Sequence, residues 1–483
     1  MAKFEAAPHR PAGRSLTFSG QDGFSNGDHR VMGQHVETLV IGAGPAGLTA
    51  AYVLAKAGRD VAVLEMDPHA VGGSSRTIDH HGFKIDLNGG AYASTSPAVL
   101  ALWSELLPDG FVEQPRTARI YHRERFYAYP LKALEALGLL GLRGAAACLA
   151  SFGLAKIRPI KAPRTFGDEI RNRFGARLSS TLFLPFAEKV SGLIRDQMPA
   201  GRAGAARPAA SLRYPRLGGG SIWRTCADQI AAFGGEVALG RRVETLKFDP
   251  ITRSWAVTIL RDDGAHEVRT ADHVVSTAPL RELMAMLRPA PISLFHAGEL
   301  MYRDQITVAL VGRTRKPLRE AAIDVHDTDL QVGRVQNYRA WSPDMAPEGE
   351  AASCLGLDYF CFEGDGLWTA SDADLVALAW REAAVMGLMD PTAVSDARVV
   401  RQRKVLPIED EDCAEHRAMI RLDLKMQFPS LHLAGRNGLH RDGARDQATL
   451  SGLMTAENIL TGETAHDVWE VSAPPPAAGR RAA

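Results

Sequence analysis

The feature that most constrains this chain is a glycine-rich turn between two short apolar runs. Residues 37–42 read ETLVIG, residues 42–47 read GAGPAG, and residues 60–65 read DVAVLE. The apolar runs predict β-strands, and residues 48–57 predict a helix that ends at Gly58. A strand, a helix and a second strand in this order predict two parallel strands joined by a crossover helix.

The spacing of the glycines predicts a site for a dinucleotide. Gly42 permits the tight turn, Gly44 lets the backbone approach a pyrophosphate, and Gly47 lets the helix pack against the strand. The N-terminus of the helix presents free N–H groups to phosphates. Glu65 ends the second strand, where it can accept hydrogen bonds from the ribose of adenosine. A purely structural turn is the alternative, and the position of Glu65 argues against it.

A second glycine-rich segment follows the second strand and favours FAD over NAD. Gly72 and Gly73 offer another close approach of the backbone to an extended ligand, and Arg76 adds positive charge for the pyrophosphate. FAD needs such a segment because its ribityl chain runs on past the pyrophosphate, whereas a small NAD domain does not. A surface turn with a solvated arginine is the alternative.

Composition excludes several classes of protein. The 483 residues include 56 basic and 56 acidic side chains, so the formal net charge is zero. A nucleic-acid partner is not expected, because proteins of that class usually carry a basic excess. The five cysteines form no CxxC pair and the fifteen histidines show no ligand spacing, so neither a disulfide framework nor a metal site is expected. The cysteine pattern, and the lack of a secretory apolar segment near the N-terminus, predict a cytoplasmic location.

Membrane contact is the one location that the apolar pattern leaves open. No uncharged run of about 18 apolar residues is present, so no transmembrane helix is expected. Residues 133–155 are unusually apolar and are interrupted only by Glu135 and Arg143. They predict a pair of buried helices, and a surface that contacts a membrane peripherally is the alternative.

Motifs along most of the chain resemble a large family of FAD-dependent proteins. The pattern of a strand, GxGxxGL, a strand ending in Glu, and GG followed by xSRT is similar to that of amine oxidases, protoporphyrinogen oxidases, phytoene desaturases and UDP-galactopyranose mutases. The resemblance covers about residues 36–462. Further motifs resemble those of the protoporphyrinogen-oxidase-like and mutase-like branch of the family. They lie at residues 86–90, 126–132, 214–220, 337–345 and 435–441.

The resemblance implies an α/β fold with two domains. A Rossmann-like FAD-binding domain is assembled from separated segments, and a mixed domain of helices and antiparallel strands covers the substrate. The expected boundaries are 36–95, 214–285 and 425–465 for the FAD domain, 96–213 and 286–424 for the substrate domain, 1–35 for a flexible extension and 466–483 for a disordered tail.

The resemblance also assigns residues to the cofactor. Gly89 and Gly90 would approach the flavin ring, Val243 would hold adenine through its main chain, and Arg436 would close over the flavin and pyrophosphate. The last helix would direct its N-terminus at the flavin, where it stabilises negative charge. The expected cofactor-binding residues are Gly42, Ala43, Gly44, Pro45, Ala46, Gly47, Glu65, Met66, Gly72, Gly73, Ser74, Ser75, Arg76, Asn88, Gly89, Gly90, Val243, Gly435, Arg436, Asp446, Gln447 and Ala448.

The FAD is predicted to be non-covalent. Covalent relatives attach the flavin through a cysteine upstream of the last FAD strand, and Cys413 is the residue in that place. Its acidic neighbours, among them Asp410 and Asp412, would raise the pKa of the thiol rather than activate it.

Two departures from the family pattern bear on the substrate. In relatives, residues 88–95 resemble GGHRFFTK and residues 406–413 resemble YPVYDEDY. Here Gly90-Ala91 replace a His-Arg pair, and residues 406–413 read LPIEDEDC. Sugar-nucleotide mutases hold a diphosphate with tyrosines and arginines, so these changes argue against a nucleotide-sugar substrate. The four consecutive acids favour a neutral or cationic substrate.

The favoured function is an FAD-dependent oxidoreductase, an oxidase or a dehydrogenase. It would remove hydride from a small organic substrate, in secondary or glycan metabolism, and O2 or another acceptor would reoxidise the flavin. A non-redox sugar mutase and a flavin-binding protein with a degenerate active site are the alternatives. The sequence leaves the substrate, the electron acceptor and the oligomeric state open. The candidate catalytic residues, each with packing or a surface role as the alternative, are His440 (as acid or base), Tyr129, Asn337, Tyr338 and Arg339.

Overall fold

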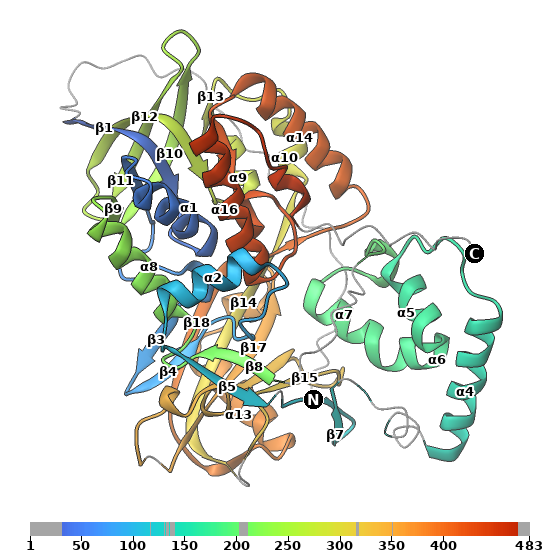
Figure 1. Ribbon diagram of the computed structural model, residues 1–483. Helices are drawn as coiled ribbons and strands as arrows, with labels where there is room; N and C mark the ends of the chain where they lie inside the picture. Colours follow the sequence, from blue (N-terminus) through green and yellow to red (C-terminus); the bar gives the residue numbers. More distant parts are fainter. Residues whose placement is uncertain are drawn as a thin grey trace.

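A computed structural model describes residues 31–115, 117–129, 131, 135, 141–201, 211–314, 318–349 and 351–471. Within this part of the chain, two large sheets and a separate group of helices make up the fold (Figure 1). Most of the expected N-terminal extension and C-terminal tail lies outside the described residues. The first strand begins at Val31, within the range that was expected for the extension.

The first sheet has the strand order β13-β10-β11-β12-β1-β2-β9, and β19 also pairs with β12. β1 pairs in parallel with both β2 and β12, as the crossover pattern predicted for the first pair. Three separated stretches of the chain therefore contribute to one sheet. Its strands are β1 (Val31–Ile41), β2 (Val61–Leu64), β9 (Glu236–Ala238), β10 (Arg241–Asp249), β11 (Ser254–Arg261), β12 (His266–Ser276), β13 (Leu287–Arg288) and β19 (Leu431–Leu433).

Helices flank the first sheet, and α1 packs against two of them. α1 (Pro45–Lys56) follows β1 directly and contacts both α8 (Gly220–Ala232) and α16 (Arg445–Thr461). The approach of α16 to α1 is close, because a Cβ atom at Gly452 would lie 2.4 Å from the carbonyl oxygen of Ala46. The other helices around this sheet are α2 (Pro97–Leu106), α9 (Leu280–Met286), α10 (Leu294–Gly298), α14 (Cys413–Gln427) and α15 (Gly435–Gly438).

The second sheet has the order β18-β14-β17-β16-β15-β6-β7. The long strands β14 and β18 run from this sheet toward the first one (Figure 1). α13 (Asp372–Val385) covers one face and buries Leu375, Ala379 and Ala383 against the apolar side chains of the strands. The strands are β6 (Ala118–His122), β7 (Arg125–Ala128), β14 (Met301–Thr314), β15 (Ala322–Val325), β16 (Arg334–Asn337), β17 (Ser353–Cys361) and β18 (Met389–Ile408), and two short helices, α11 (Tyr338–Trp341) and α12 (Gly366–Thr369), accompany them.

Two small strand pairs connect the sheets, β3 (Thr77–His80) with β4 (Phe83–Asp86) and β5 (Phe111–Pro115) with β8 (Ser211–Pro215). Asp86, at the end of β4, joins them to α8. Its buried carboxylate accepts hydrogen bonds from the hydroxyls of Thr77 and Tyr214 and, at 2.8 Å, from the N–H of Gly219. The motifs at residues 86–90 and 214–220 are therefore in direct contact.

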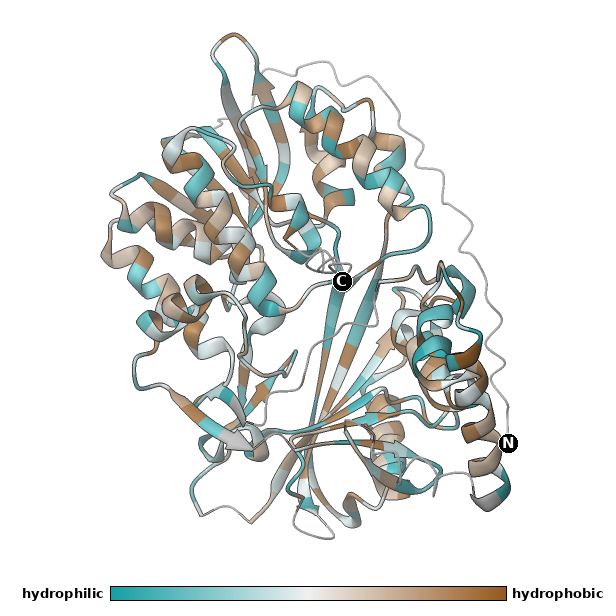
Figure 2. Cartoon of the chain, turned by 45° about the vertical axis from the view of Figure 1, so that its right-hand side comes forward, coloured by the Kyte–Doolittle hydropathy of each residue, from teal (hydrophilic) through white to brown (hydrophobic). Residues whose placement is uncertain are grey.

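The helices α4 (Gly141–Ile157), α5 (Phe166–Phe174), α6 (Ala176–Leu178) and α7 (Leu184–Ser191) stand beside the second sheet (Figure 1). Hydrophobic residues, in brown, recur along this group of helices in Figure 2. The expected burial of residues 133–155 is wrong for α4, because Leu149 and Leu154 are each 56% exposed and Phe152 is 42% exposed. Among the described residues, no helix combines the length and the apolar character that a membrane crossing requires.

Candidate cofactor site

The glycine turn has the close approaches that its spacing predicted. Gly42 has φ +96°, a left-handed conformation that favours glycine. A Cβ atom at Gly47 would lie 2.0 Å from the carbonyl oxygen of Gly42, so any side chain there would push the helix off the strand. A Cβ atom at Gly44 would meet nothing within 4 Å. The backbone at Gly44 and the N-terminus of α1 therefore face open space, which is the arrangement that a phosphate group needs.

The second glycine segment lies against the first. The N–H of Gly72 donates to the carbonyl oxygen of Ala43 at 2.8 Å. Gly73 has φ +52°, and a Cβ atom there would lie 3.3 Å from Cα of Gly44. The two loops thus form one surface of bare backbone at the N-terminus of α1.

Glu65 ties the glycine turn to the end of β2. Its buried carboxylate accepts hydrogen bonds from the N–H of Ala43 at 2.7 Å and from the N–H of Asp67 at 2.9 Å. Burial raises the pKa of Glu65, and these two N–H groups offset part of the rise. Each carboxylate oxygen keeps a second acceptor position, so Glu65 can hold the turn and still accept a bond from a ribose hydroxyl. Met66, the next residue, has an exposed side chain.

Two further residues were expected to contact the cofactor, Arg76 and Val243. Arg76 forms an ion pair with Asp67, so its charge is compensated within the protein. Its Nε atom is buried without a hydrogen-bond partner in the described part of the chain, and the contact of Arg76 with a pyrophosphate stays a prediction. Val243 is buried in β10, just before an irregularity in its pairing with β11. The start of β10 contacts the acid-bearing strand end directly, because the N–H of Arg241 donates to the carbonyl oxygen of Glu65 at 2.8 Å.

Arg445, the first residue of α16, is a site residue that the sequence analysis missed. Its guanidinium donates to Ser75 Oγ at 3.1 Å, to the carbonyl oxygen of Gly90 at 3.0 Å and to that of Asn88 at 2.7 Å. It also lies 4.4 Å from the ring centroid of Tyr92. An arginine in the first turn opposes the helix dipole, and this unfavourable placement was the signal available in the sequence.

The bonds of Arg445 bring the N-terminus of α16 to residues 88–90. A Cβ atom at Gly90 would meet nothing within 4 Å, so Gly90 presents bare backbone to open space as Gly44 does. Gly89 is different, because a Cβ atom there would lie 1.6 Å from Oε1 of Gln336 in the second sheet. At the helix end, Gln447 Oε1 accepts a hydrogen bond from the N–H of Ala444 at 2.8 Å, and Asp446 lies in the first turn.

Arg436 brings a half-buried positive charge to the same place. Its Nη2 atom lies 3.4 Å from Ser74 Oγ. Burial lowers the pKa of Arg436, Asp442 offsets part of this, and the neighbouring Arg445 adds to it. Arg436 and Arg445 place two guanidinium groups at this end of the site, and their positive charges favour the arrival of an anion. A small pocket lies here, with Gly435, Arg436, Gln447, Ala448 and Ser451 among its lining residues.

A buried polar network in the second sheet lies behind Gly89 and was also missed. Asp358 in β17 accepts hydrogen bonds from Thr307 Oγ1 and from Gln336 Nε2, both at 2.7 Å. Gln305 donates to Thr307 Oγ1 at 3.1 Å and to the carbonyl oxygen of Leu87 at 3.0 Å. Burial raises the pKa of Asp358 to about 6. The sequence did contain a sign of this network, an acidic residue inside the apolar run CLGLDYFC. Because an unpaired buried charge is costly, such a residue indicates that polar partners lie nearby.

His440 does not have the surroundings of an acid or base that acts on a substrate. The residue is fully buried, and its Nε2 atom lies 3.1 Å from the carbonyl oxygen of Ile408. Its ring packs edge-on against Tyr302 at 4.7 Å between centroids. Burial lowers its pKa to about 4. The expected catalytic role is corrected to a packing role, because a neutral ring without exposed surface cannot reach a substrate in this conformation.

The candidates at residues 337–339 are also engaged within the protein. Asn337 donates to the carbonyl oxygen of Leu318 at 2.8 Å, and Arg339 donates to that of Ala352 at 3.1 Å. Tyr338 is buried, and its hydroxyl lies so near Gly356 that a Cβ atom there would be 2.0 Å away. Tyr129 differs from these three, because its side chain is 41% exposed and its hydroxyl is close enough to Arg334 to help raise the pKa of that guanidinium.

The run of acids at residues 409–412 includes one residue that is paired with an arginine. Glu409 accepts hydrogen bonds from Arg417 Nη1 at 2.9 Å and from the N–H of Asp442 at 2.7 Å. Asp410 accepts a bond from the N–H of Cys413, and Asp412 is the N-cap residue of α14. The acids therefore begin a helix, where negative charge is stabilised. Arg417 balances the charge of Glu409, and the expected repulsion of an anionic substrate by this segment stays a prediction.

Comparison with known proteins places the fold. Residues 40–106 match the model of an NAD(P)-binding Rossmann-like domain. The sequence matches no curated protein. A solved structure of reduced UDP-galactopyranose mutase is similar with a TM-score of 0.78 and 18% identity, over 91% of this chain and 96% of that one. A protein named as a protoporphyrinogen oxidase, from Exiguobacterium sp. 255-15, is similar with a TM-score of 0.72 and 18% identity. The match covers 89% of this chain and 100% of that one.

Wild-type putrescine oxidase bound to putrescine is similar with a TM-score of 0.61 and 17% identity, over 89% of this chain and all of the other. The expected family resemblance is thus confirmed at the level of the fold. The chain contains an NAD(P)-binding Rossmann-like domain and has the fold shared by UDP-galactopyranose mutase, protoporphyrinogen oxidase and putrescine oxidase.

Proposed function

We propose that this protein is an FAD-dependent enzyme. The observation that carries the proposal is the pair of open backbone faces at Gly44 and Gly90. Arg436 contacts Ser74 in the second glycine segment and lines a pocket together with residues of the last helix. Gly44 and the N-terminus of α1 would hold the pyrophosphate, and Glu65 the ribose of adenosine. Gly90 and the N-terminus of α16 would lie at the flavin ring, where the helix end favours negative charge.

The proposed reaction is an oxidation of a small organic substrate. FAD, when bound, supplies a two-electron acceptor for hydride. The residues of this chain would orient the substrate against the ring from the side of the second sheet, where Gln336 contacts Gly89. The hydrogen-bonded group of Asp358, Thr307 and Gln305 would fix the position of Gln336 and keep that side of the site rigid.

The hydrogen bonds that three arginines make within the protein favour an oxidoreductase over a mutase that acts on a nucleotide sugar. A diphosphate needs arginines with free donors. Arg303 donates to the carbonyl oxygens of Lys189 and Phe360, and Arg339 donates to that of Ala352. Arg334 is paired with Asp324 at 2.8 Å. Each of the three arginines thus uses a nitrogen atom within the protein, which supports a substrate without a diphosphate, while the buried Nε atom of Arg303 has no hydrogen-bond partner among the described residues.

Cofactor binding can be tested by replacing Gly44, whose Cβ position is open, and by a matched replacement at a second open glycine. Gly44→Val should fold normally, because φ is −80° and nothing lies within 4 Å of its Cβ position, and it should lose FAD by filling the approach to the pyrophosphate. Gly366→Val, at another open position in α12, should keep FAD. The readout is the ratio of flavin absorbance to protein after gel filtration. A folded wild-type protein that takes up no FAD would disprove the proposal.

A flavin-dependent sugar mutase is the second candidate, favoured by the TM-score of 0.78 with UDP-galactopyranose mutase. The two candidates differ in the flavin state that they need. An oxidoreductase substrate should bleach the oxidised flavin under anaerobic conditions without another reductant. A mutase substrate should leave the oxidised flavin unchanged and be isomerised only after reduction with dithionite. The second outcome would replace the first candidate, and tight flavin binding with neither outcome across sugar nucleotides and small amines or alcohols would support a binding protein.

A further inference from the structure

Two adjacent histidines occupy the tip of the β3–β4 hairpin. The pairing of His80 with Phe83 leaves His81 and Gly82 as the two residues of the turn. Their φ values are +51° and +84°, as a type I′ turn requires, and the N–H of Gly82 donates to Asp79 Oδ1 at 3.1 Å. This turn directs the two imidazoles to the same side, with their ring centroids 4.5 Å apart.

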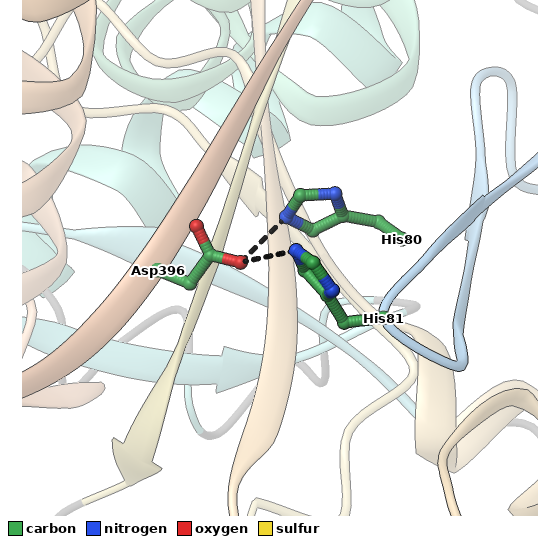
Figure 3. Close-up of side chains that lie close together, drawn as sticks. All are labelled: His80, His81 and Asp396. Atoms are coloured by element: carbon green, nitrogen blue, oxygen red, sulfur yellow. Dashed lines mark ion pairs between the residues drawn. The ribbon is translucent and has the colours of Figure 1, made fainter.

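Asp396 approaches both imidazoles from the second sheet (Figure 3). It lies on β18 opposite Val311 of β14, next to an irregularity in that pairing. Its Oδ2 atom is 2.8 Å from Nε2 of His80 and 3.5 Å from Nε2 of His81. The possible ligand atoms of these three residues all lie within 4.8 Å of one another.

We propose that His80, His81 and Asp396 form a binding site for a divalent transition ion of the zinc type. Two imidazole nitrogens and one carboxylate oxygen are ligands that zinc accepts, at about 2.0–2.2 Å, whereas magnesium and calcium prefer oxygen alone. Tetrahedral coordination at that distance puts ligand atoms about 3.3–3.5 Å apart. The two nitrogen–oxygen separations bracket this value, so small side-chain rotations would complete the site.

The polar atoms of the cluster are poorly satisfied without an ion. The Nε2 atom of His80 is buried and makes no hydrogen bond, although Oδ2 of Asp396 is 2.8 Å away, because the direction is unsuitable. A metal ion lies off the line between the nitrogen and oxygen atoms, so it can bind His80 Nε2 and Asp396 Oδ2 in the present arrangement of the side chains.

The exposure of the residues agrees with a site that opens to solvent. The side chain of His80 is 13% exposed and that of His81 is 75% exposed. A water molecule can therefore complete the coordination from the side of His81. The ion would fasten the β3–β4 hairpin to β18, and so connect the strand that leads to residues 88–90 with the second sheet.

The expectation that the chain holds no metal site is revised by this proposal. That expectation rested on the absence of ligand spacing in the sequence, and Asp396 is contributed from a distant part of the chain. The proposal does not depend on the cofactor or on the reaction.

The test uses the full chain without a histidine tag, treated with a chelator and then dialysed. Titration with Co2+ should give visible d–d bands of tetrahedral type that saturate at one ion per chain and disappear when Zn2+ is added. Zn2+ should also raise the melting temperature, because it binds the folded state. Failure of the wild-type protein to bind either ion at one equivalent would overturn the proposal.

Variants locate the site. His81→Asn should abolish the Co2+ bands and keep the fold, because His81 is exposed and asparagine tolerates the left-handed conformation at the turn. Asp396→Asn should weaken binding at least tenfold. His266→Ala is the matched control, since His266 forms a 3.1 Å pair with Glu244 that includes only one histidine. Binding that survives His81→Asn and Asp396→Asn would place the ion elsewhere and refute the assignment.

Discussion

The carboxylate of Glu65 accepts a 2.7 Å hydrogen bond from the backbone N–H of Ala43, the second residue of the glycine turn. The acid that was expected to meet a ribose therefore also fixes the conformation of the turn that precedes it. The other carboxylate oxygen accepts the N–H of Asp67, so one buried side chain holds two loops. These two bonds within the protein hold the glycine turn and the end of β2 in fixed relative positions.

Replacement of Glu65 should reduce stability even without a ligand. Glu65→Ala leaves the N–H groups of Ala43 and Asp67 without their partner, and each lost bond of a buried group costs about 1–3 kcal/mol. We expect a loss of about 3 kcal/mol in the free energy of unfolding of the apoprotein, measured by urea denaturation. Glu65→Gln keeps one acceptor oxygen and should lose about half as much. Equal stability of all three proteins would show that the two bonds contribute nothing.

Removal of the Arg445 side chain should loosen residues 88–90. Arg445→Met leaves the carbonyl oxygens of Asn88 and Gly90 unpaired, and hydrogen bonds to charged groups contribute about 1.5–3 kcal/mol each. We expect a loss of about 3 kcal/mol in stability and faster amide hydrogen exchange in peptides that contain residues 88–92. Arg253→Met, at an exposed turn, serves as the control and should change neither quantity. Unchanged exchange in the Arg445 variant would contradict the anchoring role.

Asp358 should make stability depend on pH in the acidic range. Burial raises its pKa in the folded protein to about 6, against about 3.9 in an unfolded chain. The folded state holds the proton more tightly, so the contribution of this group is fully present below about pH 4 and is lost as the pH rises through about 6. The wild type should gain up to about 3 kcal/mol over Asp358→Asn as the pH falls from about 7 to about 4. Urea unfolding at several pH values measures this, and parallel curves would refute it.

The flavin should be released on acid precipitation, because Cys413 is unsuited to form a covalent link. Its thiol is buried, and this burial raises the pKa to about 12, with further increases from Glu409 and Asp410. Acidic neighbours were expected to be the main cause, but burial has the larger effect. Precipitated protein should be colourless and the supernatant yellow. A yellow pellet with a flavin-sized mass on Cys413 would contradict this expectation.

Local patterns in the sequence were sufficient for the first part of the fold. The parallel pairing of β1 with β2, the start of α1 inside the glycine turn and the close contact of Gly47 with Gly42 agree with the spacing of a few residues. They could be predicted because strand and helix periods and the steric freedom of glycine act over short distances along the chain. Residues 133–155 show what such local patterns cannot predict. Their apolar pattern favoured burial, whereas α4 keeps part of its apolar surface exposed.

The sequence by itself determined the strand–turn–helix–strand unit and the need for bare backbone at its glycines. Only the tertiary structure decided that His440 is buried, that Arg445 binds the carbonyl oxygens of Asn88 and Gly90, and that His80 and His81 meet Asp396. The reason is physical: burial and side-chain partners depend on how distant segments pack, and a residue's immediate neighbours in the chain carry little information about that packing.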